Sequence, residues 1–217
     1  MVGGVNTEAT VPAELTAPAD AELRSKVVEA KQMTEANPIP KSCAVSGAQG
    51  IRTAFVSDDA QTMIMPIDAG LYSISSPFGY RVHPISGAAG FHAGVDFSAP
   101  RNTPIRAIAD GVVTHAGKGI DGRSNNLIIV EHTINGRTYE SWYVHMYDDG
   151  VLVSEGDVVK AGDVIGLVGS NGNSTGNHLH LEIHDLARKT SNSMDELVSP
   201  LKFLKDNGAV DISEVCR

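Results

Sequence analysis

The feature that most constrains this fold is a succession of short β-type segments, separated by glycine turns, that begins at Gly70. No convincing helical pattern lies between these segments. Asn135-Gly136 separates two of them and is the two-residue signal of a β-hairpin. Strands this short, joined by turns, are typical of an antiparallel β domain. We expect strands over residues 71–75, 111–115, 126–132, 139–145, 163–168 and 178–184.

Both ends of the chain differ in composition from this β region. Residues 7–20 are rich in Ala, Pro, Thr and Glu without periodicity, which indicates a mobile leader. Residues 19–36 are good helix formers that end at Asn37-Pro38, so they predict one peripheral helix. Residues 195–207 predict a C-terminal helix, with Pro200 near its start or at a kink. We therefore expect three parts: a leader and helix over 1–48, the β domain over 49–208 and a tail over 209–217.

The composition disfavours several classes of protein. The 217 residues include 17 Lys+Arg and 26 Asp+Glu, a net charge of −9, whereas nucleic-acid binders use basic side chains to neutralise phosphates. No apolar stretch approaches the ~18 residues that mark a membrane span. The chain opens with no signal sequence, so we expect either that an export signal has been removed or that there was none. We expect a monomer that binds no nucleic acid and spans no membrane.

The two cysteines, Cys43 and Cys216, are too far apart in the sequence to form a zinc cluster or a redox pair. We expect them to form a disulfide that joins the N-terminal extension to the C-terminal tail, as an exported protein can in an oxidising environment. The alternative is two free thiols in a cytoplasmic protein.

The strongest indication of chemistry is the pair His178 and His180 within the alternating run 178–184. Side chains two positions apart in a strand share a face, so we expect the apolar residues of the run to face the core and the two histidines to project into a groove. A purely structural histidine is rarely duplicated in this way. His184 shares the face, but four residues at ~3.3 Å each place it ~13 Å from His180, too far to bind the same ion.

A second pair, His92 and Asp96, has the spacing HxxxD. Gly94 and the nearby Pro100 disfavour a helix, and a straight strand would hold the pair ~13 Å apart. Only a bent or bulged segment would let both residues bind one ion, and Gly94 supplies the backbone freedom for that bend. HxxxD is a weak motif by itself, but together with HxH in the same β domain it predicts a metal site.

A third segment, residues 139–145, ends in Trp142-Tyr143-Val144-His145. Strand alternation places Tyr143 and His145 on one face and Trp142 on the other, so we expect Trp142 in the core. A further imidazole on a polar face suits proton transfer near neutral pH.

These residues stand in stretches that resemble the LytM/lysostaphin-type zinc endopeptidases, a family that cuts peptidoglycan cross-bridges. The resemblance follows the family's order from about Gly70 to His184. Its departures are mild, because Asn102, Asn177 and Leu181 stand where the family usually has Gly, Pro and Phe, and none of the three removes a ligand. The matching stretches are SPFGYR at 76–81, HPISG at 83–87, HAGVDFSAP at 92–100, ADGVV at 109–113, YVH at 143–145, GDVVKAG at 156–162 and STGNHLHLE at 174–182.

The resemblance implies a mainly β, antiparallel LytM-like domain with a groove and a zinc ion (Zn2+) bound by His92, Asp96 and His180. His145 and His178 would be the catalytic pair, and either could be the general base. Two imidazoles and one carboxylate would leave the fourth position of zinc for water, as in catalytic zinc sites. The candidate substrate-binding residues are Tyr80, Arg81, His83 and Tyr143.

The implied function is a zinc metalloendopeptidase that hydrolyses peptide cross-links of bacterial peptidoglycan by means of a metal-activated water. Its partners would be stem peptides or cross-bridges, and we expect a secreted or cell-wall-associated protein of bacterial or phage origin. Two alternatives stay open. A non-catalytic LytM-like module that binds the wall or activates another hydrolase usually lacks metal ligands, and a metal store or structural zinc site would not need the two additional histidines.

Overall fold

The computed structural model describes residues 42–47, 50–55, 62–82, 87, 89–123, 126–190 and 194–212, with the backbone alone in the first two ranges. The expected leader and N-terminal helix lie outside these residues, as does His83. The expected disulfide also lies outside them, because Cys216 and the side chain of Cys43 are not described. The proposed division at residues 48 and 208 stays a prediction. None of the helices described has the length and apolar character needed to cross a membrane.

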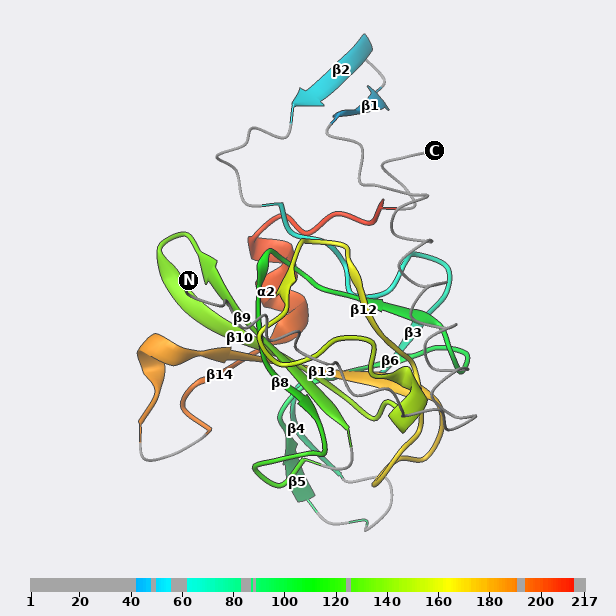
Figure 1. The fold of residues 1–217 in the computed structure, drawn as a ribbon, viewed down its shortest axis with the longest axis vertical. Helices are drawn as coiled ribbons and strands as arrows, with labels where there is room; N and C mark the ends of the chain where they lie inside the picture. The colour runs from blue at the N-terminus through cyan, green and yellow to red at the C-terminus, as the bar shows by residue number, and fades with distance from the viewer. Residues whose placement is uncertain are drawn as a thin grey trace, which may run out of the picture.

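One antiparallel sheet of eight strands organises the described residues (Figure 1). Seven strands follow the order β11-β8-β9-β10-β13-β6-β3, and β14 pairs with the second half of β13. This arrangement confirms the expected mainly antiparallel β fold. The strands are β3 Ser73–Ser76, β6 Val95–Ser98, β8 Gly111–Gly117, β9 Leu127–Ile134, β10 Arg137–Val144, β11 Val158–Val159, β13 His178–Asp185 and β14 Leu197–Val198.

Three two-stranded sheets and a short helix complete the described elements. The sheets pair β1 Ser42–Gly47 with β2 Gly50–Phe55, β4 Gly79–Val82 with β5 Ala89–His92, and β7 Pro104–Arg106 with β12 Val164–Leu167. Two 3-10 turns cover Asp148–Gly150 and Leu186–Arg188. The helix α2 covers Pro200–Asp206.

The C-terminal helix is shorter than the sequence predicts. Pro200 lies in the first turn of α2, where the missing N–H has no intrahelical partner to lose. The preceding residues 197–198 form β14 instead of the first turn of a helix. Of the two positions expected for Pro200, the structure therefore confirms the one near the helix start.

The predicted hairpin at Asn135-Gly136 is also confirmed. Asn135 and Gly136 have φ angles of 51° and 74°, and they join β9 to β10 with Ile134 opposite Arg137. Positive φ at both central residues is the requirement of a type I′ turn.

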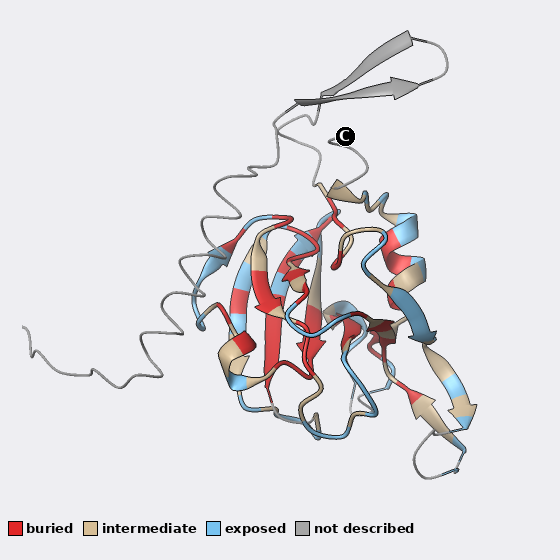
Figure 2. Ribbon diagram, turned by 90° about the vertical axis from the view of Figure 1, so that its right-hand side faces the viewer, coloured by how far each residue is buried: buried red, intermediate tan, exposed pale blue. Residues whose placement is uncertain are grey.

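The main sheet has two different faces. One face carries the main core, in which Leu179, Leu181 and Ile183 of β13 are fully buried, as the alternation predicts. Buried residues are concentrated in the central strands of the sheet (Figure 2). The other face carries a smaller cluster formed by Leu127, Ile129, Trp142 and Val144. The polar residues of β13 lie on this second face, and beyond His178 every residue of the strand is buried. The apolar and polar residues of the run thus lie on opposite faces, as predicted, and of the polar residues only His178 is not buried.

The chain bends at Gly94, between β5 and β6, and there it passes close to β13. A Cβ atom at Gly94 would lie 2.3 Å from the Leu181 carbonyl oxygen and 2.8 Å from Nε2 of His180. Gly94 is not among the described glycines with a positive φ. The chain bends as predicted, but the predicted role of Gly94 is wrong. Glycine is needed here because a side chain would have no space, and not because the backbone has a positive φ.

We expect Gly94→Ala to lower the free energy of unfolding by about 1–3 kcal/mol, because the added methyl group overpacks the contact with the β13 backbone. Denaturant unfolding followed by circular dichroism measures the change. Gly90→Ala is the matched control, since Gly90 lies in β5 and its Cβ would meet no atom within 4 Å. Equal losses in the two variants would contradict this account of Gly94.

Candidate metal centre

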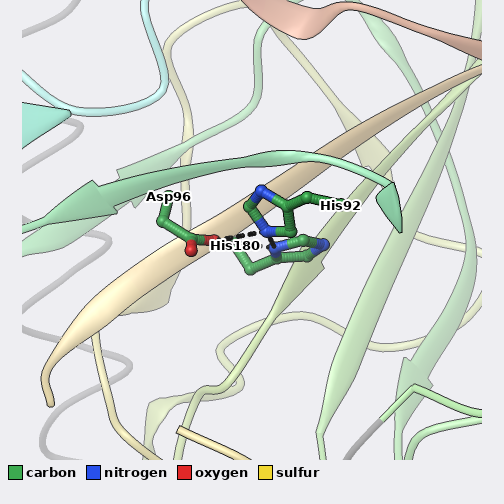
Figure 3. A group of neighbouring side chains, drawn as sticks. All are labelled: His92, Asp96 and His180. Atoms are coloured by element: carbon green, nitrogen blue, oxygen red, sulfur yellow. Dashed lines mark hydrogen bonds and ion pairs between the residues drawn. The ribbon is translucent and has the colours of Figure 1, made fainter. Parts of the chain in front are cut away.

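Three side chains from separate parts of the sequence meet where β6 pairs with β13. Asp96 and His180 are directly opposite residues of this antiparallel pair, so their side chains lie next to each other on one face. His92, the last residue of β5, reaches the same point because the chain bends after it. Nδ1 of His180 lies 2.8 Å from Oδ1 of Asp96 and 3.0 Å from Nε2 of His92, and the third side of this triangle is 3.1 Å (Figure 3).

Each imidazole is oriented by a hydrogen bond from its other nitrogen. Nδ1 of His92 donates to the carbonyl oxygen of Pro77 at 2.8 Å, and Nε2 of His180 donates to the carboxylate of Glu182 at 3.0 Å. A neutral histidine that donates from one nitrogen has its lone pair on the other. Metal-binding histidines are held in this way by carboxylates and backbone carbonyl groups. Both rings therefore present a potential ligand nitrogen toward Asp96.

The donor set fits one zinc ion. Zinc binds imidazole nitrogen and carboxylate oxygen at about 2.0–2.2 Å. Every side of the triangle is shorter than two such bonds, about 4 Å, so a single ion can contact all three atoms. Among the described residues, His92, Asp96 and His180 form the group whose possible ligand atoms all lie within 4.8 Å of one another. Three protein ligands leave a position open, as in catalytic zinc sites.

The charges at this point suit a cation. Burial would raise the pKa of Asp96, but hydrogen bonds from His180 and His92 hold it well below its usual range, so the carboxylate is ionised. Burial would lower the pKa of His180, whereas hydrogen bonds with Asp96 and Glu182 raise it to about 9. In the metal-free protein, His180 thus carries a second proton on Nδ1. Binding of an ion releases that proton.

Two further histidines lie beside the triangle. Nδ1 of His145 donates to the carbonyl oxygen of Asn171, and Nδ1 of His178 donates to that of Gly176, both at 2.8 Å. The two rings are 4.7 Å apart between centroids, and Nε2 of His178 is 3.7 Å from Oδ1 of Asp96. Burial lowers the pKa of His145 to about 4, so its ring is neutral at pH 7. The structure therefore brings the expected pair together with the three candidate ligands.

The expected position of Tyr143 is wrong. The strand β10 ends at Val144, and His145 has a φ of 77°, so the alternation of the strand does not extend to His145. Tyr143 is fully buried in the main core, where its hydroxyl accepts hydrogen bonds from the backbone N–H of Ile108 and from Oγ of Ser141. Burial raises the pKa of Tyr143 to about 12. Tyr143 is a core residue and does not line the groove.

Trp142 is buried, as predicted, but in the smaller cluster on the other face of the sheet. Its indole ring stacks on His184, with centroids 4.4 Å apart and planes inclined by 19°. His184 lies outside the triangle, as expected. Trp142 thus packs beside the polar residues of β13 instead of in the main core.

A cavity of about 340 Å³ opens beside the triangle. Arg81 and Phe91 of the β4–β5 hairpin line it, together with His145 and His178. Tyr80 lies on the same hairpin and is 86% exposed, with its ring edge-on against Phe91. Arg81 is therefore in position to contact a ligand in this cavity, while Tyr80 lies next to its wall.

Glu182 and Arg123 also line the cavity, and neither is among the site residues predicted from the sequence. Glu182 stands two residues after His180, which is the spacing that connects His178 to His180. That spacing is the signal that could have identified Glu182. Arg123 lies in the loop between β8 and β9, and its two hydrogen bonds to Glu182, of 2.9 and 2.6 Å, depend on the folded structure.

Comparison with known proteins agrees with this geometry. The sequence model of peptidase family M23 matches residues 90–195. The chain is 49% identical over 109 residues to the DD-carboxypeptidase/endopeptidase Mpg of Neisseria meningitidis, an alignment that covers 50% of this chain and 24% of Mpg. It is 38% identical over 131 residues to the glycyl-glycine endopeptidase ALE-1 of Staphylococcus capitis, covering 60% of this chain and 34% of ALE-1. The chain thus spans about a quarter of the length of Mpg and about a third of that of ALE-1.

The fold is also similar to a solved structure, the catalytic domain of the antimicrobial peptidase lysostaphin from Staphylococcus simulans. The TM-score is 0.51 and the sequence identity is 35%, over 62% of this chain and 92% of the lysostaphin domain. Almost the whole of that catalytic domain therefore has a counterpart here. The chain belongs to peptidase family M23.

Proposed function

We propose that the protein is a zinc-dependent endopeptidase that hydrolyses peptide bonds of bacterial peptidoglycan. The observation that carries this proposal is the triangle of His92, Asp96 and His180 beside a cavity that two further histidines line. Because peptidoglycan lies outside the cytoplasmic membrane, we also propose that the enzyme acts as a secreted or wall-associated protein.

In this proposal, His92, Asp96 and His180 hold the zinc ion. Zinc bound there would lower the pKa of a water ligand from about 15.7 to about 7 and polarise the scissile carbonyl group. His145 and His178 both donate from Nδ1 to backbone carbonyl groups, so Nε2 of each ring is the nitrogen that exchanges protons. These two nitrogens would take the proton of the attacking water, hydrogen-bond to the developing oxyanion and deliver a proton to the leaving amine.

The two alternatives to an enzyme have less support. A non-catalytic module needs neither the complete set of candidate ligands nor the additional histidines, and all five side chains lie together here. A structural zinc site usually has four protein ligands and no open position. The described part of the chain offers three ligand side chains, next to a cavity.

For the substrate, we propose a peptide with a carboxylate close to the scissile bond. Arg81 places a guanidinium group in the cavity wall, and a guanidinium can bind a carboxylate through two parallel hydrogen bonds. Stem peptides carry carboxylates at D-alanine and at diamino acids, whereas the interior of a glycine bridge carries none. The relative Mpg is named a DD-carboxypeptidase/endopeptidase, which is consistent with a direct cross-link as the substrate. Tyr80, beside the wall of the cavity, stays a candidate substrate contact, and so does His83 on the strength of the sequence.

We expect His180→Ala to lose both zinc and activity, because it removes a ligand, and Asp96→Ala to do the same. His178→Ala and His145→Ala should keep zinc and lose turnover. Zinc content by mass spectrometry, and dye release from labelled peptidoglycan, measure the two properties on the same samples. Equal zinc loss in His178→Ala and His180→Ala would show that ligand and catalytic roles are wrongly divided between them. No hydrolysis of any wall type by the zinc-loaded protein would favour the non-catalytic module.

We expect faster cleavage of walls with direct cross-links than of glycine-bridged walls, because Arg81 can pair with a nearby carboxylate. Mass spectrometry of the released fragments identifies the bond. Arg81→Gln should lower kcat/KM on directly cross-linked walls by roughly 10- to 100-fold, the value of a hydrogen bond to a charged group. Arg101→Gln is the control, since the Arg101 guanidinium stacks over Tyr147 and Arg101 does not line the cavity. Preferential cleavage of glycine bridges would contradict the assignment.

A further inference from the structure

A buried carboxylate lies directly behind the candidate zinc ligand His180. The side chain of Glu182 is 2% exposed and receives four hydrogen bonds. Nε2 of His180 and Nε of Arg123 donate to Oε1 at 3.0 and 2.9 Å. Nε2 of His184 and Nη2 of Arg123 donate to Oε2 at 2.9 and 2.6 Å. An ionised carboxylate has about four lone-pair sites, so every acceptor site of Glu182 is in use.

This saturation fixes the direction of each proton. The guanidinium of Arg123 can only donate hydrogen bonds, and it contacts both oxygens of Glu182. Glu182 is therefore the acceptor in this ion pair. Nε2 of His180 must carry a hydrogen, which leaves Nδ1 of that ring for a metal.

Arg123 determines the plane of the carboxylate. The imidazoles of His180 and His184 each supply one hydrogen bond, from opposite sides of Glu182. Arg123 supplies two from one planar group, and such paired hydrogen bonds fix orientation as well as distance. Without them, half of the acceptor sites of Glu182 lose their donors, and the carboxylate can rotate about its terminal bond.

Arg123 is itself held from two directions. Its Nη1 donates to the carbonyl oxygen of Asp121 at 2.8 Å, within its own loop. Its guanidinium carbon lies 5.1 Å from the centre of the Trp142 ring, and Trp142 in turn stacks on His184. The side chain of Arg123 is 22% exposed and lines the cavity together with Glu182, so the ion pair lies at the cavity wall.

We propose that Arg123 is a positioning residue for the metal centre, which acts through Glu182 to hold Nδ1 of His180 in place for zinc. The inference rests on the proposed function, because it assigns zinc to the triangle. A buried ion pair is weak evidence of a contribution to stability, since the cost of desolvation offsets the attraction. The geometry points instead to orientation of a ligand. Partners of this kind typically change metal affinity about 10- to 100-fold when they are removed.

The test compares Arg123→Gln, Arg123→Lys and the control Arg137→Gln with the unmodified chain. Arg137 pairs with Asp185, on the same strand as Glu182, but has no contact with the triangle. Zinc dissociation constants are measured by competition with a chromophoric chelator, and the cobalt(II) forms are compared by absorption spectroscopy. We expect Arg123→Gln to weaken zinc binding about 10- to 100-fold and to shift the cobalt spectrum. Arg123→Lys, which keeps the charge but not the paired donors, should weaken it less, and Arg137→Gln should not change it.

A role in stability alone makes a different prediction. It would lower the melting temperature of the metal-free protein and leave zinc affinity and the cobalt spectrum of the folded protein unchanged. That result in Arg123→Gln would overturn the proposal. If Arg123→Gln does not fold, an unchanged zinc affinity and spectrum in Arg123→Lys would overturn it equally. Failure of the unmodified chain to bind zinc would overturn the proposed function as well, so the two failures are distinguishable.

Discussion

The pairing of β6 with β13 is the constraint on which the candidate site depends. It sets Asp96 directly opposite His180, and the bend at Gly94 brings His92 to the same place. A shift of one residue in this register would turn His180 and Glu182 into the main core and Leu179 out of it. The apolar residues on the other side of β13 oppose that shift, because they are fully buried in the main core. Hydrophobic packing on one face thus fixes the geometry of the polar face.

The two faces of β13 make different contributions, one to the stability of the fold and the other to the geometry of the candidate site. Around Glu182, charged and hydrogen-bonding groups are buried together, and no buried side-chain nitrogen or oxygen in the described part of the chain lacks a hydrogen-bond partner. A fully satisfied network of this kind gives fixed orientations. The main core supplies stability through buried apolar area, while this network orients one side of the candidate site.

Features that depend on local patterns could be predicted from the sequence. The alternation of 178–184, the type I′ turn at Asn135-Gly136 and the need for a bend between His92 and Asp96 are all present in the structure. Features that depend on where a strand ends, or on contacts between residues far apart in the sequence, could not be predicted. Alternation alone predicts Tyr143 in the groove, because no local signal shows that β10 ends at Val144. The contact of Arg123 with Glu182 joins residues 59 positions apart.

X-ray absorption at the zinc K-edge of the zinc-loaded protein identifies the ligands of the ion itself. With one zinc per chain, we expect only nitrogen and oxygen ligands, with the outer-shell scattering of two imidazole rings and a first-shell distance of about 2.0–2.1 Å. Scattering from three or more imidazoles, or from sulfur at about 2.3 Å, would contradict the assignment of His92, Asp96 and His180 as the ligand set.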